Sequence, residues 1–86
     1  MKVLFTQQSW EDYLYWNTYD KSKVKRINQL IKEIQRHPYT GSGKPEALRN
    51  KLSGLWSRRI DLEHRLIYRI KDPYVEIVKC RSHYGE

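Results

Sequence analysis

The sequence predicts an α+β fold in which two N-terminal helices pack on one face of a small twisted antiparallel sheet. Three observations support this prediction. Apolar residues in the N-terminal half recur at three- and four-residue spacing, as along one side of a helix. Apolar residues in the C-terminal half alternate with polar ones, as along a strand. The chain has 86 residues, too few to fill two hydrophobic cores, so we expect one domain over residues 1–86 built as two layers.

The two helices are predicted from their caps and their apolar stripes. Ser9 can cap the first helix, with Asp12 as a weak capping-box partner. The stripe expected to face the sheet consists of Trp10, Tyr13, Leu14 and Asn17. Asp20 can cap a second helix over residues 21 to about 37, which Pro38 ends. The apolar stripe of that helix, opposite its lysines and arginines, consists of Val24, Ile27, Leu30, Ile31 and Ile34.

The strands are predicted from the alternation of apolar and polar residues. The segments expected to form them are residues 2–5, 55–61, 65–71 and 74–81. The pair Asp72-Pro73 should turn the last two segments into a hairpin. In residues 65–71, apolar side chains at alternate positions can pack on the helices while arginines point to an open basic face. In the irregular middle, Pro45 is predicted to open a single helical turn that carries Glu46, Leu48 and Arg49.

Charge and composition limit the class of partner. Lys and Arg total 17 against 10 Asp and Glu, a formal net charge of +7, which favours RNA, DNA, an anionic membrane or an acidic protein segment. No apolar run approaches the length of a membrane-spanning helix, and the first residues do not form a signal sequence. The single cysteine, Cys80, excludes an internal disulfide. We therefore expect a cytoplasmic protein with no membrane partner, in which Cys80 is a small buried side chain.

Residues that could carry out chemistry gather on the predicted open face. The strands contribute Arg58, Arg59, Arg65, Arg69, Lys79 and Arg81, and the last strand leads to His83 and Tyr84. Glu46 precedes these strands, beside Lys44 and Arg49. Cleavage of RNA without a metal needs a base for the 2′-hydroxyl proton, an acid for the leaving 5′-oxygen and cations for the charged phosphorane. Histidine, a carboxylate and arginine can fill these roles.

Each of these residues also has an interpretation without catalysis. His83 can be a solvated residue near the C-terminus, Glu46 can complement a helix N-terminus, and the arginines can form a solvated face. From the residues alone, a nuclease and a non-catalytic RNA-binding module are equally supported. The sequence Gly41-Ser-Gly-Lys44 lacks the Walker spacing. No residues have the spacing of a zinc site or a two-metal site, so we expect no metal and no cofactor.

Seven stretches of the sequence together resemble the YoeB family of bacterial toxins. They are SWEDYLYW at 9–16, KRINQLIK at 25–32, GKPE at 43–46, LSG at 52–54, WSRRI at 56–60, EHRLIY at 63–68 and HY at 83–84. The resemblance implies a toxin of a type II toxin–antitoxin pair, within the RelE-like group of ribosome-dependent mRNA endoribonucleases. It also implies a YefM-like antitoxin, contacts with the ribosome and mRNA, a homodimer, and binding of operator DNA only through the antitoxin complex.

The resemblance also implies roles for individual residues. Glu46 would be the general base, His83 the general acid and Arg65 the group that stabilises the transition state. The residues that would hold the substrate are Lys44, Arg49, Arg59 and Tyr84. Two features depart from the family pattern: Arg49 stands where a lysine is expected, and Gly85-Glu86 follow the terminal His-Tyr pair. A binding module that blocks translation without cutting RNA, or a co-repressor acting with the antitoxin, is the alternative.

Overall fold

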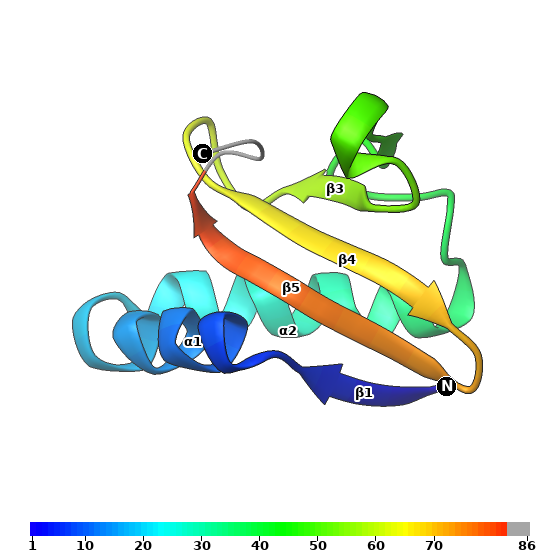
Figure 1. Ribbon diagram of the computed structural model, residues 1–86. Helices are drawn as coiled ribbons and strands as arrows, with labels where there is room; N and C mark the ends of the chain where they lie inside the picture. Colours follow the sequence, from blue (N-terminus) through cyan, green and yellow to red (C-terminus); the bar gives the residue numbers. More distant parts are fainter. Residues whose placement is uncertain (83–86) are drawn as a thin grey trace.

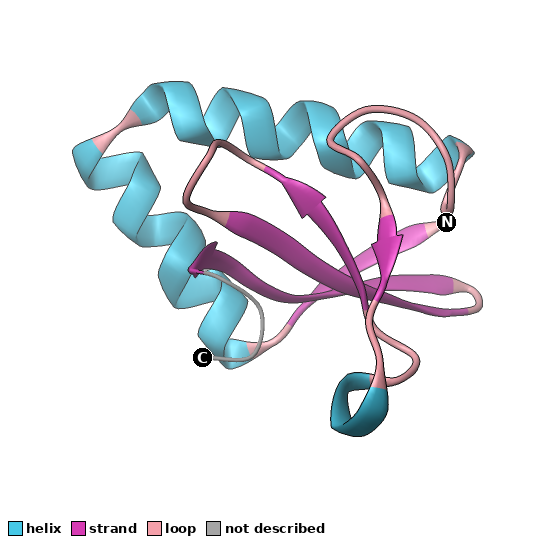
Figure 2. Ribbon diagram, turned by 90° about the horizontal axis from the view of Figure 1, so that it is seen from above, coloured by secondary structure: helices cyan, strands magenta, loops and turns pink. Residues whose placement is uncertain are grey.

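The computed structural model describes residues 1–82, in which a strand and two helices precede four further strands. The elements are β1 (Lys2–Phe5), α1 (Gln7–Tyr19), α2 (Lys21–Arg36), β2 (Glu46–Ala47), a 3₁₀ turn (Asn50–Leu52), β3 (Trp56–Arg59), β4 (Arg65–Lys71) and β5 (Tyr74–Ser82). Both helices lie on one side of a twisted five-stranded sheet of order β1-β5-β4-β3-β2 (Figure 1, Figure 2). The predicted α+β fold of two layers is therefore confirmed.

The sheet is mixed rather than wholly antiparallel. Strands β3, β4 and β5 pair antiparallel, as predicted, and the β4–β5 hairpin turns at Asp72-Pro73. The short strand β2, which was not predicted, also pairs antiparallel with β3. At the edge of the sheet, β1 runs parallel to β5, with Val3 opposite Val75. A parallel pair needs a long crossover connection, and the chain from α1 to β4 provides it. Alternation along a strand does not reveal the direction of its neighbour, so the sequence pattern could not predict this parallel edge.

Helix α2 matches its prediction in position and in its apolar stripe. Its N-cap is Asp20, whose side chain accepts a hydrogen bond from the Ser22 backbone N–H at 3.0 Å. The buried stripe residues are Ile27, Leu30, Ile31 and Ile34, and they share one core with Leu66, Tyr68, Val75 and Ile77 of the sheet. Burial of each such side chain contributes about 1.5–3 kcal/mol. Within residues 1–82, neither helix has the length and apolar content needed to cross a bilayer.

Helix α1 begins earlier than predicted. Its N-cap is Thr6, whose hydroxyl accepts a hydrogen bond from the backbone N–H of Ser9 at 3.1 Å. Ser9 therefore lies in the first turn, and its own hydroxyl donates to the carbonyl of Ile77 in β5 at 2.6 Å. Thr6 and Ser9 both have cap chemistry, so the sequence alone could not distinguish a hydroxyl that caps the helix from one that docks it on the sheet.

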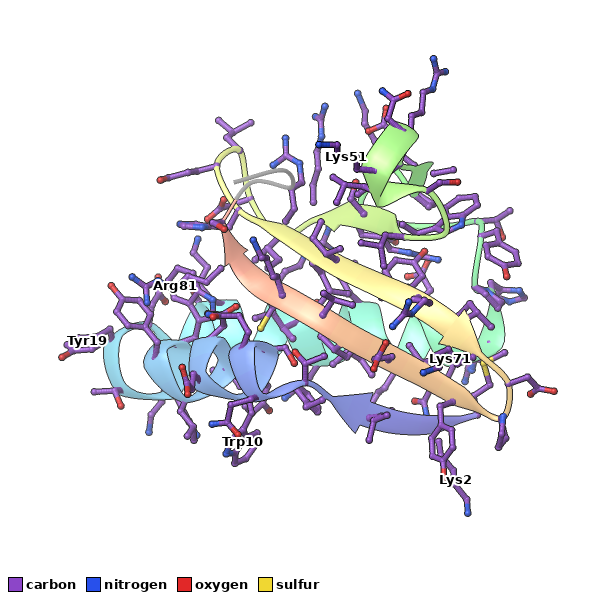
Figure 3. The ribbon with its side chains drawn as sticks, in the orientation of Figure 1. Lys2, Trp10, Tyr19, Lys51, Lys71 and Arg81 are labelled. Atoms are coloured by element: carbon purple, nitrogen blue, oxygen red, sulfur yellow. The ribbon has the colours of Figure 1, made fainter. Side chains whose placement is uncertain are left out.

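The face of α1 that packs on the sheet also differs from the predicted stripe. Its buried residues are Ser9, Asp12 and Trp16. By contrast, Trp10 and Leu14 are 45% and 42% exposed, and Trp10 projects away from the sheet (Figure 3). Asp12 accepts a hydrogen bond from the Cys80 N–H at 3.0 Å, and the Trp16 indole donates to the Cys80 carbonyl at 2.8 Å. The helix thus satisfies polar backbone groups of β5, a requirement that apolar periodicity does not reveal.

The segment after Pro45 forms a strand rather than the predicted helical turn. Glu46 and Ala47 pair antiparallel with β3, and Glu46 lies opposite Ser57. The 3₁₀ turn comes later, at Asn50–Leu52. Proline is compatible with an extended chain as well as with a helix start. Because the edge of β3 offers backbone hydrogen-bond partners, strand pairing decides the conformation here.

Cys80 is fully buried in the core, as predicted. Desolvation raises the pKa of its thiol to about 12, and the nearby Asp12 carboxylate adds to the rise, so little reactive thiolate forms at neutral pH. We expect a thiol reagent to label the native protein at least about 10²-fold more slowly than the urea-unfolded chain, as measured by mass spectrometry. Equal labelling rates for the two states would contradict this burial.

Candidate active site

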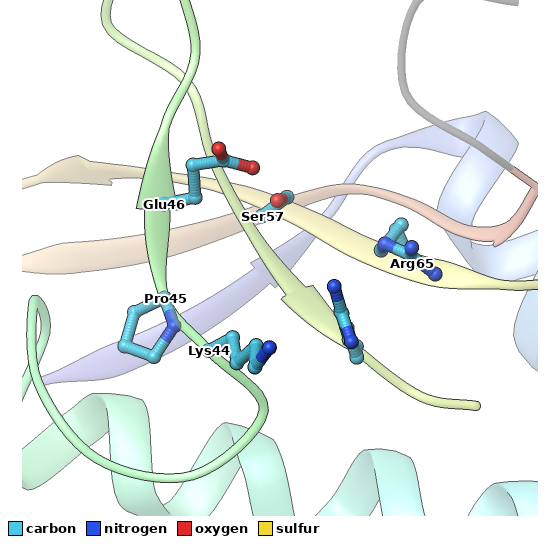
Figure 4. Close-up of a pocket in the computed structure, with 6 residues that line it drawn as sticks. Lys44, Pro45, Glu46, Ser57 and Arg65 are labelled. Atoms are coloured by element: carbon cyan, nitrogen blue, oxygen red, sulfur yellow. The ribbon is translucent and has the colours of Figure 1, made fainter. Parts of the chain in front are cut away.

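A cleft of about 460 Å³ opens where the segment before β2 meets β3 and the start of β4. The residues that line it are Lys44, Pro45, Glu46, Ser57, Arg59 and Arg65 (Figure 4). Four of the seven predicted site residues therefore lie together, one carboxylate and three cations.

Strand register brings these side chains together. Glu46 lies opposite Ser57 in the β2–β3 pair, and Arg59 lies opposite Arg65 in the β3–β4 pair. Ser57 and Arg59 are two residues apart on β3 and so share one face of the sheet. Neighbouring strands are about 4.8 Å apart, and Ser57 lies between Glu46 and Arg65 (Figure 4). A single nucleotide can therefore contact the carboxylate on one side and the guanidinium groups on the other.

Arg65 is anchored by the loop between β3 and β4. Its Nη1 donates to the carbonyls of Asp61, Leu62 and His64 at 3.2, 3.4 and 3.3 Å. The loop itself closes on the Asp61 carboxylate, which accepts a hydrogen bond from the His64 N–H at 2.6 Å and pairs with the Lys23 ammonium at 2.9 Å. Because one nitrogen of the guanidinium is held in place, Arg65 loses less side-chain freedom when it binds an anion.

The ion pair of Asp61 predicts how stability depends on pH. Partial burial raises the pKa of the Asp61 carboxyl, but the Lys23 ammonium and the N–H groups of His64 and Glu63 outweigh it and bring the pKa from 3.8 to about 2. A lowered folded-state pKa stabilises the protein above pH 4, and this stabilisation disappears as the pH falls from about 4 to about 2. Urea unfolding should therefore show Asp61→Asn less stable than the parent at pH 7, by a margin that shrinks over that range.

The matched control for this measurement is Asp72→Asn, a change at an exposed aspartate in the hairpin turn. We expect its stability to follow that of the parent across the same range. A constant difference between Asp61→Asn and the parent from pH 7 to pH 2.5 would contradict the assignment of the ion pair.

The prediction that Arg58 belongs to the open face is wrong. Its side chain is fully buried on the core side of β3. It donates to the backbone carbonyls of His37, Thr40 and Ser42 at 2.7, 2.9 and 3.2 Å. Consecutive residues of a strand point to opposite faces, so Arg58 must point inward if Arg59 points to the cleft.

Two other cations expected on the open face have partners away from the cleft. Arg69 donates to the Glu76 carboxylate on β5, with Nε at 3.0 Å from Oε1. The guanidinium of Arg81 lies over the Tyr15 ring, 3.7 Å from its centroid. Among residues 1–82, the cations that line the cleft are therefore Lys44, Arg59 and Arg65.

Arg49, a further predicted site residue, lies beside the cleft rather than in it. Arg49 is exposed and lines a neighbouring hollow of about 260 Å³ beside the 3₁₀ turn, to which Glu46 also contributes. His83 and Tyr84 lie outside the described residues. Ser82, the last described residue of β5, pairs with Arg65.

Ser57 lines the cleft although no role was predicted for it from the sequence. It is 2% exposed and occupies the strand between Glu46 and Arg65. Its hydroxyl can donate to a carboxylate or a phosphate oxygen. The available signal was its spacing of two residues from Arg59, which places both on one face of β3.

The cleft combines groups that suit an anionic substrate. Guanidinium groups can hold phosphate oxygens through paired hydrogen bonds, and a carboxylate beside them can accept a proton. Among residues 1–82, no group of three His, Cys, Asp or Glu side chains is arranged to hold a metal ion. The arrangement fits proton transfer and electrostatic stabilisation at a phosphodiester.

The comparisons of the sequence and of the structure with known proteins both match YoeB toxins. The family model for the YoeB-like toxin of bacterial type II toxin–antitoxin systems matches residues 5–84. Toxin YoeB of Escherichia coli strain K12 is 54% identical over 84 residues, which cover 98% of this chain and 100% of the relative. The YoeB dimer from Staphylococcus aureus superposes with a TM-score of 0.92 at 45% identity, and the alignment covers 98% of both chains. The heterotetrameric YoeB–YefM toxin–antitoxin complex from the same species gives a TM-score of 0.90, at the same identity and coverage.

The class of protein is therefore a bacterial toxin of a type II toxin–antitoxin system, built here as two helices on one side of a mixed five-stranded sheet. The chain belongs to the family of YoeB-like toxins of bacterial type II toxin–antitoxin systems. The resemblance noted in the sequence is thereby confirmed.

Proposed function

We propose that this chain is a ribosome-dependent endoribonuclease that cleaves mRNA in the ribosomal A site and so inhibits translation. The observation that carries the proposal is the meeting of Glu46 with Arg59, Arg65 and Lys44 in one cleft. The reaction is attack of the 2′-hydroxyl on the neighbouring phosphodiester by metal-free general acid–base catalysis.

Each role is the one that the family resemblance implies, and each suits the chemistry of the residue. Glu46 takes the proton of the 2′-hydroxyl, and Arg65 stabilises the charge that develops on the phosphorane. His83 protonates the leaving 5′-oxygen; it follows Ser82, the residue that pairs with Arg65. The substrate is held by Lys44, Arg49, Arg59 and Tyr84.

Dependence on the ribosome has a physical reason. The cleft is small and open, so by itself it cannot hold a flexible message in the in-line geometry that attack on phosphorus requires. The decoding site can supply that geometry, and a net charge of +7 favours contact with ribosomal RNA. The chain would then act in the cytoplasm, where its substrate complex is found.

We also propose that the chain pairs with a YefM-like antitoxin and forms a homodimer. The toxin from Staphylococcus aureus, which shares its fold at 45% identity, has been solved as a dimer and in complex with YefM. The complex with the antitoxin would bind operator DNA, and the chain alone would not.

The experiment adds purified protein to ribosomes stalled on a defined mRNA and maps the RNA ends. We expect new ends within the A-site codon, and none when the nucleotide 5′ to the cut carries a 2′-deoxyribose, because the attacking hydroxyl is then missing. Glu46→Ala and His83→Ala should lose cleavage. Glu63→Ala, which removes an exposed carboxylate from the β3–β4 loop, should retain it. Inhibition of translation without new RNA ends would instead indicate a non-catalytic binding module.

A further inference from the structure

The segment that carries Lys44 and Glu46 into the cleft is held by one buried side chain. Residues 37–45 connect α2 to β2 without forming a helix or a strand. Arg58 reaches this segment from the core side of β3, and its Nη2 donates to the carbonyls of His37 and Thr40 at 2.7 and 2.9 Å. Its Nη1 donates to the carbonyl of Ser42 at 3.2 Å. Three carbonyls of a connecting segment therefore converge on a single guanidinium.

Two further contacts complete this arrangement around Arg58. Its Nε donates to the Tyr68 hydroxyl at 3.2 Å, and that hydroxyl donates to the Pro38 carbonyl at 2.6 Å. The backbone N–H of Arg59 donates to the Gly43 carbonyl at 2.7 Å. The segment is thus tied at successive positions to β3, the strand that also presents Arg59 to the cleft.

Glu33, in the last turns of α2, closes the arrangement from the other side. Its Oε1 accepts a hydrogen bond from the backbone N–H of Ser42 at 2.5 Å and lies 3.4 Å from Nη1 of Arg58. The pKa of the Glu33 carboxyl is lowered, first by the Ser42 N–H and hydroxyl and also by the Arg58 charge. A Cβ at Gly41 would collide with the Glu33 carboxylate, so the segment passes too close for any larger residue.

The two charged residues differ in burial. The Arg58 side chain has no exposed surface, whereas that of Glu33 is 29% exposed. Replacement of Glu33 therefore releases the Ser42 N–H without opening a hole in the core. This difference separates an effect on the geometry of the cleft from an effect on folding.

We propose that Arg58 and Glu33 are positioning residues: they clamp residues 37–43 and thereby aim Lys44 and Glu46 into the cleft. The effect of the clamp on catalysis rests on the proposed function. The contacts that form the clamp do not depend on it. Neither residue touches the substrate. Their effect on the reaction passes through the position of Glu46, and a displacement of about 1 Å at a catalytic group can slow a reaction by about 10²-fold.

The first test measures the clamp without any reaction. Amide hydrogen exchange is compared between the parent, Glu33→Ala and Glu76→Ala; Glu76 is the acidic partner of Arg69 in an ion pair between β4 and β5. We expect exchange at the Ser42 N–H to be at least about tenfold faster in Glu33→Ala and unchanged in Glu76→Ala. Unchanged exchange at Ser42 in a folded Glu33→Ala protein overturns the clamp.

The second test measures its consequence in single-turnover cleavage on stalled ribosomes. Glu33→Ala should lower the maximal rate by about tenfold or more. The toxin concentration that gives half of that rate should change by a smaller factor, because Lys44 shifts with Glu46 while Arg59 and Arg65 stay on β3 and β4. Glu33→Gln keeps an oxygen that accepts from Ser42 and should recover most of the loss. Arg58→Lys, which cannot reach all three carbonyls, should fall below Glu33→Ala. A parental rate for Glu33→Ala overturns the positioning role.

A double substitution separates failure of the clamp from failure of the proposed function. If Glu33 acts on the chemical step through Glu46, adding Glu33→Ala to Glu46→Ala should not lower the maximal rate any further. If the loss of rate in the double variant equals the two single losses combined, Glu33 does not act through Glu46. If Glu46→Ala itself cleaves at the parental rate, the proposed base is wrong, and the exchange at Ser42 still decides whether the clamp exists.

Discussion

Arg65→Ala should slow mRNA cleavage by about 10²–10³-fold, the usual loss when one preorganised donor to a charged transition state is removed. The maximal rate should change more than the toxin concentration that gives half of that rate, because Lys44 and Arg59 still line the cleft and can hold the substrate. Arg65→Lys should restore only part of the rate, because an ammonium cannot hold two phosphate oxygens in the fixed geometry of a guanidinium. Single-turnover cleavage on stalled ribosomes measures both variants.

The matched control for this prediction lies on the same strand. Arg69→Ala removes an identical side chain from β4, but Arg69 is paired with Glu76 and does not line the cleft. We expect it to cut at close to the parental rate. If both alanine variants lose activity equally, the effect is one of overall charge on ribosome binding, and Arg65 has no special role in the chemistry.

The elements with strong periodic patterns could be predicted from the sequence. Helix α2 has Ile27, Leu30 and Ile34 in the core and an aspartate at its N-cap. Strand β4 was predicted with the correct bounds, since Leu66 and Tyr68 face the core. In both elements, burial of the apolar face outweighs the local preferences of individual residues for other conformations.

Helix α1 could not be predicted in the same detail, because its inward face is polar. Ser9 and Asp12 are buried by hydrogen bonds to the backbone of β5, whose position depends on the whole fold. An apolar pattern has no information about such partners. The exposed Trp10 and Leu14 gave a misleading stripe for this reason.

The candidate site was predicted through family resemblance, and its geometry required the register of the sheet. Arg58 lies opposite Leu66, and Arg59 lies opposite Arg65. The length of the β3–β4 loop sets this register, and a shift of one residue would exchange the two arginines between core and cleft. Because side chains alternate along β3, only one of the two arginines can face the cleft. Which one does so depends on the side of the strand on which the core lies, and the sequence of β3 alone does not give that.

Arg58→Met should be the most destabilising change at a polar residue of this chain. Methionine fills a similar volume, but it leaves the carbonyls of His37, Thr40 and Ser42 without their donor. Breaking a buried network of this kind costs about 3–5 kcal/mol, a large share of the 5–15 kcal/mol that stabilises a typical domain. Urea unfolding should show the loss as a lower midpoint, with the slope of the transition unchanged.

The neighbouring residue provides the control for this prediction. Arg59→Met makes the same chemical change one position along β3, at a side chain that is exposed in the cleft. We expect it to alter stability by no more than about 0.5 kcal/mol while weakening RNA cleavage, so that the two adjacent arginines separate folding from function. If Arg58→Met and Arg59→Met unfold at the same urea concentration, the guanidinium of Arg58 is not what holds residues 37–42 against β3.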